Sequence, residues 1–381
     1  MKFYSKRDLI PALIFFVGGV ALIRDTAYNG HDFAVFWQAA RSILEGQPIY
    51  SVARDGNMVF KYPPWIAPFF LPFGLVPLHW AKWIWGGIEV FSLLSVIAWL
   101  LKVQKCRKMT CVGLAISYWG LWAIHALDGQ IALVMLALSL WLWRDTVFEK
   151  FNLRSIALFF TLSVKIFTLY PLCMNRWSRK FFCTLGWIAL GALIFSFPAW
   201  WASHQSPSEF ISSWSEAAAS GGRFFSAYDI RGTRNQGFPA LILRILGVPA
   251  AQSYADLIAF IFCAFPIGFF WPWASKSLRK SEIWLGWLAL VPAVHPLPWG
   301  HLFVFSFPLA VTALERAIQN RQRSWIGLCV LGILLILSND KTLAPVGMIL
   351  AWGSGKSWGI LLCAISLVFT NFSLSRKSTT G

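Results

Sequence analysis

The chain has few charged residues, and acidic residues are fewer than basic ones. Charged residues make up only 13% of its 381 residues, and Asp and Glu together number 16. Soluble domains carry about 25% charged residues. At 57% hydrophobic and 17% aromatic residues, the sequence has too little polar surface to cover a water-soluble body of this length. The composition excludes an ordinary soluble enzyme and indicates a protein embedded in lipid.

Several chemical signatures are also missing from the sequence. It contains no glycine-rich phosphate loop and no Asp-x-Asp motif, which argues against a bound nucleotide or a required metal. No two histidines have the i, i+4 spacing of a helical metal motif. The 7 cysteines lie in apolar runs or beside basic clusters, so they imply no disulfide framework. We therefore expect neither a metal nor another cofactor.

Basic residues are in excess, with a formal net charge of +17, and their position decides what the excess means. In a soluble protein it would suggest nucleic acid as a partner, which we do not expect here. The basic residues instead cluster between apolar runs, at about 2–7, 102–108, 144–154, 176–180, 276–280, 316–323 and 376–377. This is the positive-inside pattern, and it predicts a multi-pass protein of the plasma (inner) membrane with both termini in the cytoplasm.

The apolar runs predict an all-α polytopic fold. One crossing needs about 20 residues, and the runs together suggest about 10–12 transmembrane or half-membrane helices in a single integral membrane domain, residues 1–381. The first run is interpreted as a retained helix, with a cleaved signal peptide as the alternative. The clearer spans lie near 9–23, 80–101, 110–127, 129–143, 181–201, 257–273, 283–299, 301–315, 324–338 and 357–373.

Two apolar stretches do not fit simple crossings. Residues 64–78 contain four prolines, so we expect a broken or interfacial segment buried against other helices. Residues 155–173 carry Lys165 in the middle and basic residues at both ends. They form either a re-entrant pair of half-helices, which we favour, or one crossing. Glu89, inside the span 80–101, is expensive in lipid and should face the protein interior.

The two long loops predicted on the outer side are residues 24–79 and 202–256. In the first, residues 29–32 read Asn-Gly-His-Asp and precede apolar residues at helical spacing that end at Gly46. This pattern predicts an amphipathic helix lying at the membrane surface. Asp32 belongs at its start, either as a helix-capping residue or as a functional acid. The apolar residues are Phe33, Phe36, Trp37, Ala40 and Leu44.

Three further polar groups stand at predicted outer helix ends. They are residues 128–130 (Asp-Gly-Gln), residues 231–236 (Arg-Gly-Thr-Arg-Asn-Gln) and residues 295–301, which begin and end with histidine. Ionisable groups at or below the membrane interface are costly and usually mark a pathway or a site. Any chemistry should therefore face the periplasm or the exterior.

These residues resemble glycosyltransferase family 87, a branch of the C-type superfamily. The opening carries the resemblance: Asp32-Phe33, Phe36-Trp37, Ala39-Ala40-Arg41, Gly46, Tyr50 and Tyr62-Pro63-Pro64. Further along, Gly129-Gln130, Asn235-Gln236 with Arg244, and Pro296 with Trp299 and His301 follow the family's order. The resemblance covers about residues 28 to 315.

The resemblance implies a membrane enzyme that moves a sugar from a polyprenyl-phosphate carrier to a hydroxyl of a lipid or glycan acceptor on the outer face. The sugar is mannose in most of the family, and arabinofuranose remains open. Asp32 would be the general base of an inverting single displacement. The donor phosphate would be bound by Arg223, Arg231, Arg234 and His301. Substrate-binding residues would be His31, Phe36, Trp37, Arg41, Tyr62, Asp128, Gln130, Asn235, Gln236, His295 and Trp299.

Each of these residues also has an ordinary interpretation. An outer-loop arginine can be a solvated charge or a lipid headgroup contact, and most of the tryptophans can belong to interfacial belts. The main alternative function is a transporter or flippase of a polyprenyl-linked sugar, although the sequence shows no internal repeat of the kind transporters use. A non-catalytic membrane scaffold is a further alternative.

Overall fold

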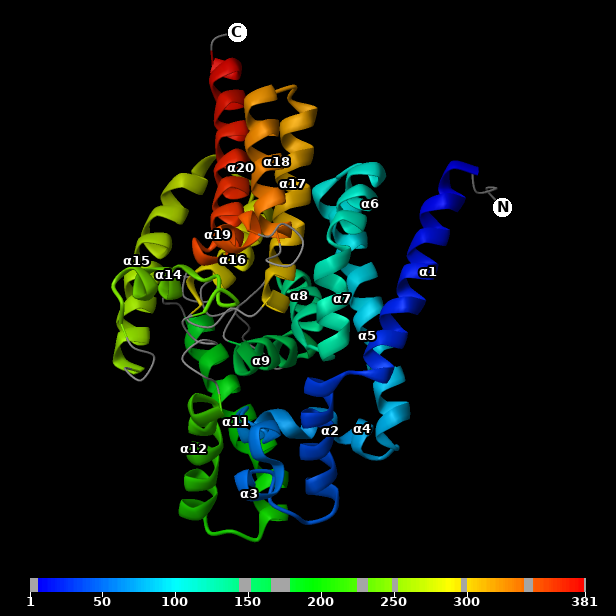
Figure 1. Cartoon of the computed structure of the whole chain (residues 1–381), viewed down its shortest axis with the longest axis vertical. Helices are drawn as coiled ribbons and strands as arrows, with labels where there is room; N and C mark the ends of the chain where they lie inside the picture. Colours follow the sequence, from blue (N-terminus) through cyan, green and yellow to red (C-terminus); the bar gives the residue numbers. More distant parts are fainter. Residues whose placement is uncertain are drawn as a thin grey trace.

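The computed structural model describes residues 6–143, 152–165, 179–224, 232–248, 253–295, 300–338 and 345–379. All regular structure in these ranges is helical, which confirms the all-α class for this part of the chain (Figure 1). The first half comprises α1 (Lys6–Tyr28), α2 (His31–Leu44), α3 (Val52–Asp55), η1 (Gly56–Met58), η2 (Pro64–Phe70), α4 (Leu71–Gly74), α5 (Leu78–Trp99), η3 (Leu100–Gln104), α6 (Lys108–Ser117), α7 (Trp119–Asp128), α8 (Ala132–Trp141) and α9 (Leu153–Lys165).

The second half contains the longest helices. It comprises α11 (Arg179–Ser203), α12 (Pro207–Phe224), α14 (Phe238–Ile245), α15 (Ser253–Ala274), η4 (Ser275–Ser277), α16 (Lys280–Val294), η5 (Gly300–Ser306), α17 (Phe307–Gln319), α18 (Arg323–Leu337), α19 (Val346–Trp352) and α20 (Gly355–Thr379). Helices α17, α18 and α20 pack together as a bundle at one end of the molecule, and α2, α3 and α12 lie at the other (Figure 1).

Among the described residues, 4 helices are long and apolar enough to cross a membrane: Leu78–Gln104, Lys180–Ser203, Gly300–Gln319 and Gly355–Phe372. Helices α6 and α7 add a fifth span if their pair, bent by 58°, is one crossing. Shorter apolar helices lie in other predicted runs, including Ala132–Trp141 and Arg323–Leu337. The chain is therefore a multi-pass membrane protein, and the larger number of crossings stays a prediction.

The proline-rich stretch 64–78 does not form one long helix. It contains η2 and α4, with Pro68 inside η2, because proline has no backbone N–H to donate and breaks regular helix. The segment packs against α11 and α2, and Phe69 stacks on Phe195 of α11 at 4.8 Å between ring centroids. In the other ambiguous stretch, α9 covers Leu153–Lys165, and the choice between a re-entrant pair and a crossing lies outside the described residues.

Helix α2 begins within the predicted residues 29–32 and ends two residues before Gly46, which is in the left-handed conformation (φ 66°). Its environment differs from the expectation of a helix lying on the membrane surface. The apolar face is covered by protein: Phe33 and Phe36 are at most 2% exposed. Phe33 stacks on Trp85 of α5 at 5.0 Å, and Phe36 on Phe70 of η2 at 4.4 Å. The proline-broken segment folds over α2 and takes the place that lipid was expected to fill.

The two long loops singled out in the sequence pack against each other. Tyr50 lies beside Phe210 of α12, with ring centroids 5.6 Å apart. Trp65 meets Trp214, one helical turn further along α12, edge-on at 5.8 Å. Elements of residues 24–79 and helix α12 thus form one layer at the end of the molecule that carries α3, whereas α14 of the second loop packs against α15 (Figure 1).

The opposite end is held by two fully buried carboxylates. Glu282 of α16 pairs with Arg279 at 2.7 Å and with Arg316 of α17 at 2.9 Å. Glu315 of α17 pairs with Arg107 at the start of α6, at 2.8 Å. Basic clusters that the charge pattern places on one side of the membrane therefore meet at one end of the helix bundle.

We expect Glu282→Ala to lower the free energy of unfolding by about 3 kcal/mol, because it leaves two arginines without their buried partner. The measurement is the thermal unfolding midpoint of the detergent-solubilised protein. Glu216→Ala, on the exposed face of α12, is the control and should leave the midpoint unchanged. Equal midpoints for the two variants would contradict the assigned role.

Candidate functional site

The candidate site is built where two glycines touch. Gly30 precedes α2 and Gly129 follows α7, and both have positive φ (41° and 65°). A Cβ on Gly129 would lie 2.8 Å from the Cα of Gly30, so only glycine allows this approach. The Gly30 N–H donates to the Leu127 carbonyl at 3.0 Å. This contact brings the loop before α2 against the loop between α7 and α8.

Asp32 and Gln130 meet at this junction, although 98 residues separate them. The Gln130 side-chain amide donates a hydrogen bond to Oδ2 of Asp32. The N-cap of α2 is Gly30, without a side-chain cap bond, so Asp32 lies in the first helical turn and is not the N-cap residue. A carboxylate there is favoured in its ionised form by the helix dipole. The half-buried Asp32 is therefore an oriented carboxylate at a helix start.

Lys61 and Tyr62 also lie within electrostatic range of Asp32. Burial lowers the pKa of the Lys61 ammonium, and the charge of Asp32 partly opposes that shift. Burial raises the pKa of the Tyr62 phenol, and Asp32 raises it further. The Tyr62 carbonyl accepts a hydrogen bond from the Tyr50 hydroxyl at 2.8 Å. Sequence reasoning missed Lys61, although its place directly before the Tyr-Pro-Pro motif was the available signal.

Two other predicted residues belong to the same junction. His31 is the first residue of α2 and is exposed. Asp128, the last residue of α7, interacts electrostatically with His31. The structure thus brings His31, Asp32, Tyr62, Asp128 and Gln130 into one neighbourhood, as a shared site requires.

Residues further along α2 make contacts that hold the fold. Phe36 is 2% exposed in the hydrophobic core. Trp37 donates its indole N–H to the Val76 carbonyl at 3.0 Å. Arg41 pairs with Glu45 at 2.5 Å, about two and a half turns beyond Asp32. A substrate-binding role for these residues stays a prediction.

The register of α17 and η5 against α6 and α7 indicates where His301 lies. Near the end of α17, Glu315 pairs with Arg107, and at the end of η5 the Ser306 hydroxyl lies 3.1 Å from that of Tyr118. The two chain segments therefore run antiparallel. Since η5 also packs against both α7 and α8, its first residues, with the buried His301, lie toward the end of α7 that carries Asp128.

Asn235 and Gln236 belong to a second polar cluster. Arg244 donates to the Gly232 carbonyl at 3.0 Å and to the Asn235 carbonyl at 2.8 Å. Burial lowers the pKa of Arg244 to about 10, which leaves it charged at neutral pH. The Gln236 side-chain carbonyl accepts the Lys356 backbone N–H at 3.1 Å, at the start of α20. The loop before α14 is therefore fixed to the C-terminal helix.

Lys356 links this second cluster to η5. Its side chain is buried and donates to the Ser338 carbonyl at 2.8 Å. Its ammonium also lies 5.9 Å from the ring centroid of Phe303, two residues after His301. Sequence reasoning did not identify Lys356. The two polar clusters thus lie on elements that both contact η5.

The remaining predicted residues are placed only in part. Arg234 is exposed in the turn before α14, and His295 is the half-buried C-cap residue of α16. Arg231, Trp299 and the side chain of Arg223 lie outside the described residues. No group of three His, Cys, Asp or Glu side chains that could hold a metal ion occurs within the part of the chain that the structure describes.

Comparisons with protein-family models, curated proteins and solved structures found no match. The functional interpretation therefore depends on the geometry of the site.

The glycine contact can be tested directly. We expect Gly129→Ala to lower the free energy of unfolding by about 1–3 kcal/mol, because Cβ meets the Gly30 backbone and φ is positive. Gly120→Ala in α7, where a Cβ meets open space, should be neutral or stabilising by up to about 1 kcal/mol. Chemical or thermal unfolding in detergent measures both. An unaffected Gly129→Ala variant would be incompatible with the close approach.

Proposed function

We propose that the protein is a membrane glycosyltransferase that moves a sugar from a polyprenyl-phosphate carrier to an acceptor hydroxyl. The observation that carries this proposal is the Asp32 carboxylate, oriented by the Gln130 amide at the junction of α2 and α7, with the Lys61 ammonium within electrostatic range. A positioned carboxylate supplies a general base, and a neighbouring cation supplies a partner for phosphate.

In the proposed reaction, the acceptor hydroxyl attacks the anomeric carbon of the donor sugar. Asp32 accepts the hydroxyl proton while the bond from the anomeric carbon to the phosphate oxygen breaks. The departing polyprenyl phosphate keeps the electron pair of that bond. Attack opposite to the phosphate inverts the configuration in one displacement, and this needs one carboxylate rather than the two of most glycosidases.

The departing phosphate needs cations, and Lys61 is added here to those proposed from the sequence. Arg234 is exposed next to the second polar cluster, and His301 lies toward the same end of α7 as Asp128. The proposal retains Arg223 and Arg231 as further phosphate ligands. Because phosphate can be neutralised by these side chains, the chemistry requires no metal or nucleotide.

The proposal also includes the structural features that the resemblance to glycosyltransferase family 87 implies. These are a C-type glycosyltransferase fold with about 10–12 transmembrane or half-membrane helices, cytoplasmic termini, and a site that faces the periplasm or the exterior. Two arrangements support it: the layer formed by the first long loop and α12 lies away from the end held by Glu282 and Glu315, and the basic clusters 102–108, 276–280 and 316–323 meet at that end. By the positive-inside rule the latter end is cytoplasmic.

A transporter of a polyprenyl-linked sugar is the second candidate, and one observation favours it. Glu89 of α5 and His125 of α7 lie 3.2 Å apart and are both buried. Intramembrane ionisable pairs of this kind occur in proton-coupled transporters.

The decisive experiment is the transfer of radiolabelled mannose from synthetic polyprenyl-phosphate-mannose to a membrane lipid extract, with an arabinofuranose donor run in parallel. We expect Asp32→Asn to lower transfer by at least about 100-fold, because the general base is lost. Asp55→Asn, in the same long loop and paired only with its neighbour Arg54 among the ion pairs described, should keep activity within about twofold.

The two functions give different results in this experiment. An inactive Asp32→Asn beside an active Asp55→Asn supports the transferase. If the wild type moves no label with either donor but carries the donor lipid across a vesicle membrane, the transporter is correct. Equal transfer by both variants would exclude Asp32 as the base.

The proposed role of Lys61 predicts that kcat/KM for the donor depends on pH. If its ammonium binds the donor phosphate, Lys61→Ala should lower kcat/KM for the donor by about 10–100-fold. Burial lowers the Lys61 pKa below its ordinary 10.5, and the charged form exists below that pKa. The wild-type kcat/KM should therefore fall as pH rises through it.

The control for this profile is Lys61→Arg, which keeps its charge at every pH tested. Its kcat/KM should not show the alkaline fall. Lys102→Ala, an exposed lysine in η3, should match the wild type. An alkaline fall that persists in Lys61→Arg would assign the titration to another group.

A further inference from the structure

We propose that Glu89 is a positioning residue that ties the ends of α1 and α7 together and so sets the Asp32–Gln130 contact. The inference deepens the proposed function and rests on it only for its kinetic measurement. Glu89 lies in a membrane-spanning helix and is 3% exposed, which confirms that it faces the protein interior.

Glu89 contacts two helices besides its own. Its Oε2 accepts a hydrogen bond from the Thr26 hydroxyl of α1 at 2.7 Å. Its Oε1 lies 3.2 Å from Nε2 of His125 in α7. Thr26 and His125 are both fully buried. One carboxylate therefore joins the last turns of the helices that precede the two site loops.

The same face of α5 fixes α1 at two further points. Lys82 donates its ammonium to the Asn29 carbonyl, just before α2, at 2.6 Å. A Cβ on Gly86 would lie 3.0 Å from the Cα of Ile23. Positions 82, 86 and 89 share one helix face by their i, i+4, i+7 spacing. Helix α5 is thus the support against which the end of α1 is aligned.

The contacts between α1–α2 and α7–α8 occur at three successive levels. Glu89 bridges Thr26 and His125, the Gly30 N–H donates to the Leu127 carbonyl, and Gln130 donates to Asp32. The Gln130 backbone N–H also bonds the His125 carbonyl at 3.1 Å. On each chain segment the successive levels are only two to four residues apart, so a shift at Glu89 reaches Asp32 over a short length of chain.

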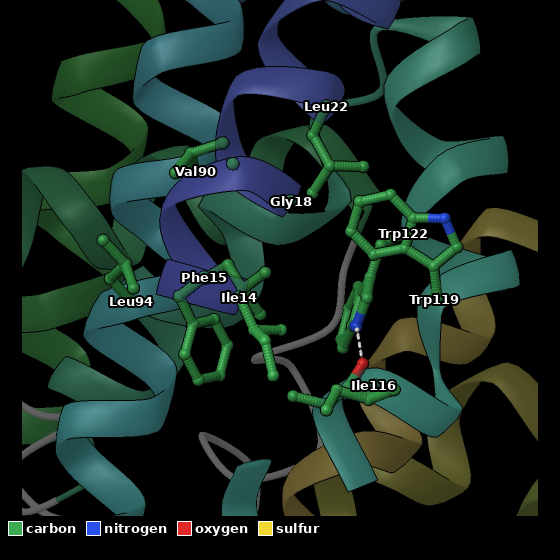
Figure 2. Close-up of a pocket in the computed structure, with 12 residues that line it drawn as sticks. Ile14, Phe15, Gly18, Leu22, Val90, Leu94, Ile116, Trp119 and Trp122 are labelled. Carbon is green, nitrogen blue, oxygen red and sulfur yellow. Dashed lines mark hydrogen bonds between the residues drawn. The ribbon is translucent and has the colours of Figure 1, made fainter. Parts of the chain in front are cut away.

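Below the Glu89 level the packing is apolar. Figure 2 shows a pocket between α1, α5 and the α6–α7 bend, lined by apolar residues and glycines that include Leu22, Val90 and Trp122. Leu22 is one turn before Thr26, and Trp122 is three residues before His125. Apolar packing fixes helices in contact but is not directional. The hydrogen bond from Thr26 to Glu89, which lies between this apolar packing and Asp32, is directional.

Stability alone does not favour an ionisable group here. An intramembrane carboxylate is expensive, and neither Glu89 Oε1 nor either ring nitrogen of His125 has a hydrogen-bond partner among the described residues. An apolar side chain would fill the same space at lower cost, but it could not fix the relative position of α1 and α7. This supports a role in alignment.

The positioning of α1 and α7 by Glu89 is tested first by hydrogen exchange of the full-length protein in lipid nanodiscs. This measurement needs no enzymatic activity. Glu89→Ala should raise exchange at the Gly30 and Gln130 amides by at least about tenfold, because their hydrogen bonds open more often. Glu89→Gln keeps an oxygen that can accept the Thr26 hydroxyl and a polar atom facing His125, so it should match the wild type. The control is Ser92→Ala, a buried residue in α5 whose hydroxyl bonds only its own helix among the hydrogen bonds described; it should also match.

The kinetic test uses the same variants in the sugar-transfer assay. Misplacing the base costs turnover more than binding, so Glu89→Ala should lower kcat by about 10–100-fold and change the donor KM by less than about twofold. Glu89→Gln should restore kcat to within about threefold of the wild type.

The possible outcomes distinguish the positioning role of Glu89 from the proposed sugar-transfer activity. Wild type without transfer overturns the proposed function, while hydrogen exchange still decides the tie. Unchanged exchange in Glu89→Ala, or an equal kcat loss in Ser92→Ala and Glu89→Ala, overturns the positioning role. A Glu89→Gln variant as impaired as Glu89→Ala also overturns it, because the hydrogen bonds would then not suffice.

Discussion

The site depends on the backbone contact between Gly30 and Gly129. A Cβ on Gly129 would meet the Cα of Gly30 at 2.8 Å, and a Cβ on Gly30 would meet the Thr26 carbonyl oxygen at 2.5 Å, so both positions require glycine. That approach lets the short side chains of Asp32 and Gln130 reach each other from distant parts of the sequence. With a larger residue at position 129, the two loops would move apart, and the carboxylate at the helix start would lose the amide that orients it.

Much of the helical framework could be predicted, because apolar runs and prolines act locally. The bounds of α2 follow from its helical spacing and Gly46, and the breaks in η2 and α4 follow from their prolines. What covers the apolar face of α2 could not be predicted, since protein and lipid satisfy the same pattern. Only the tertiary fold places Phe70 and Trp85 there.

The candidate site was predictable in its residue types and less so in its contacts. Asp32 and Gln130 stood out as polar residues beside glycine at helix ends, yet nothing in the sequence pairs them. Lys61 and Lys356 were missed because a single lysine in a loop or at a helix start is usually solvated. Their burial depends on elements far away in the chain, such as the Phe303 ring beside Lys356.

The arrangement around Asp32 also bears on how one carboxylate could serve as a base. The helix start, the Gln130 amide and the Lys61 ammonium all favour its charged form, which would make it a weak base in the absence of substrate. A departing phosphate would attract Lys61 and reduce its interaction with Asp32. Closure around two substrates would remove water and strengthen the remaining interactions. The carboxylate would then be most basic when the acceptor proton must leave, so the cation that binds the phosphate would also couple its departure to proton transfer.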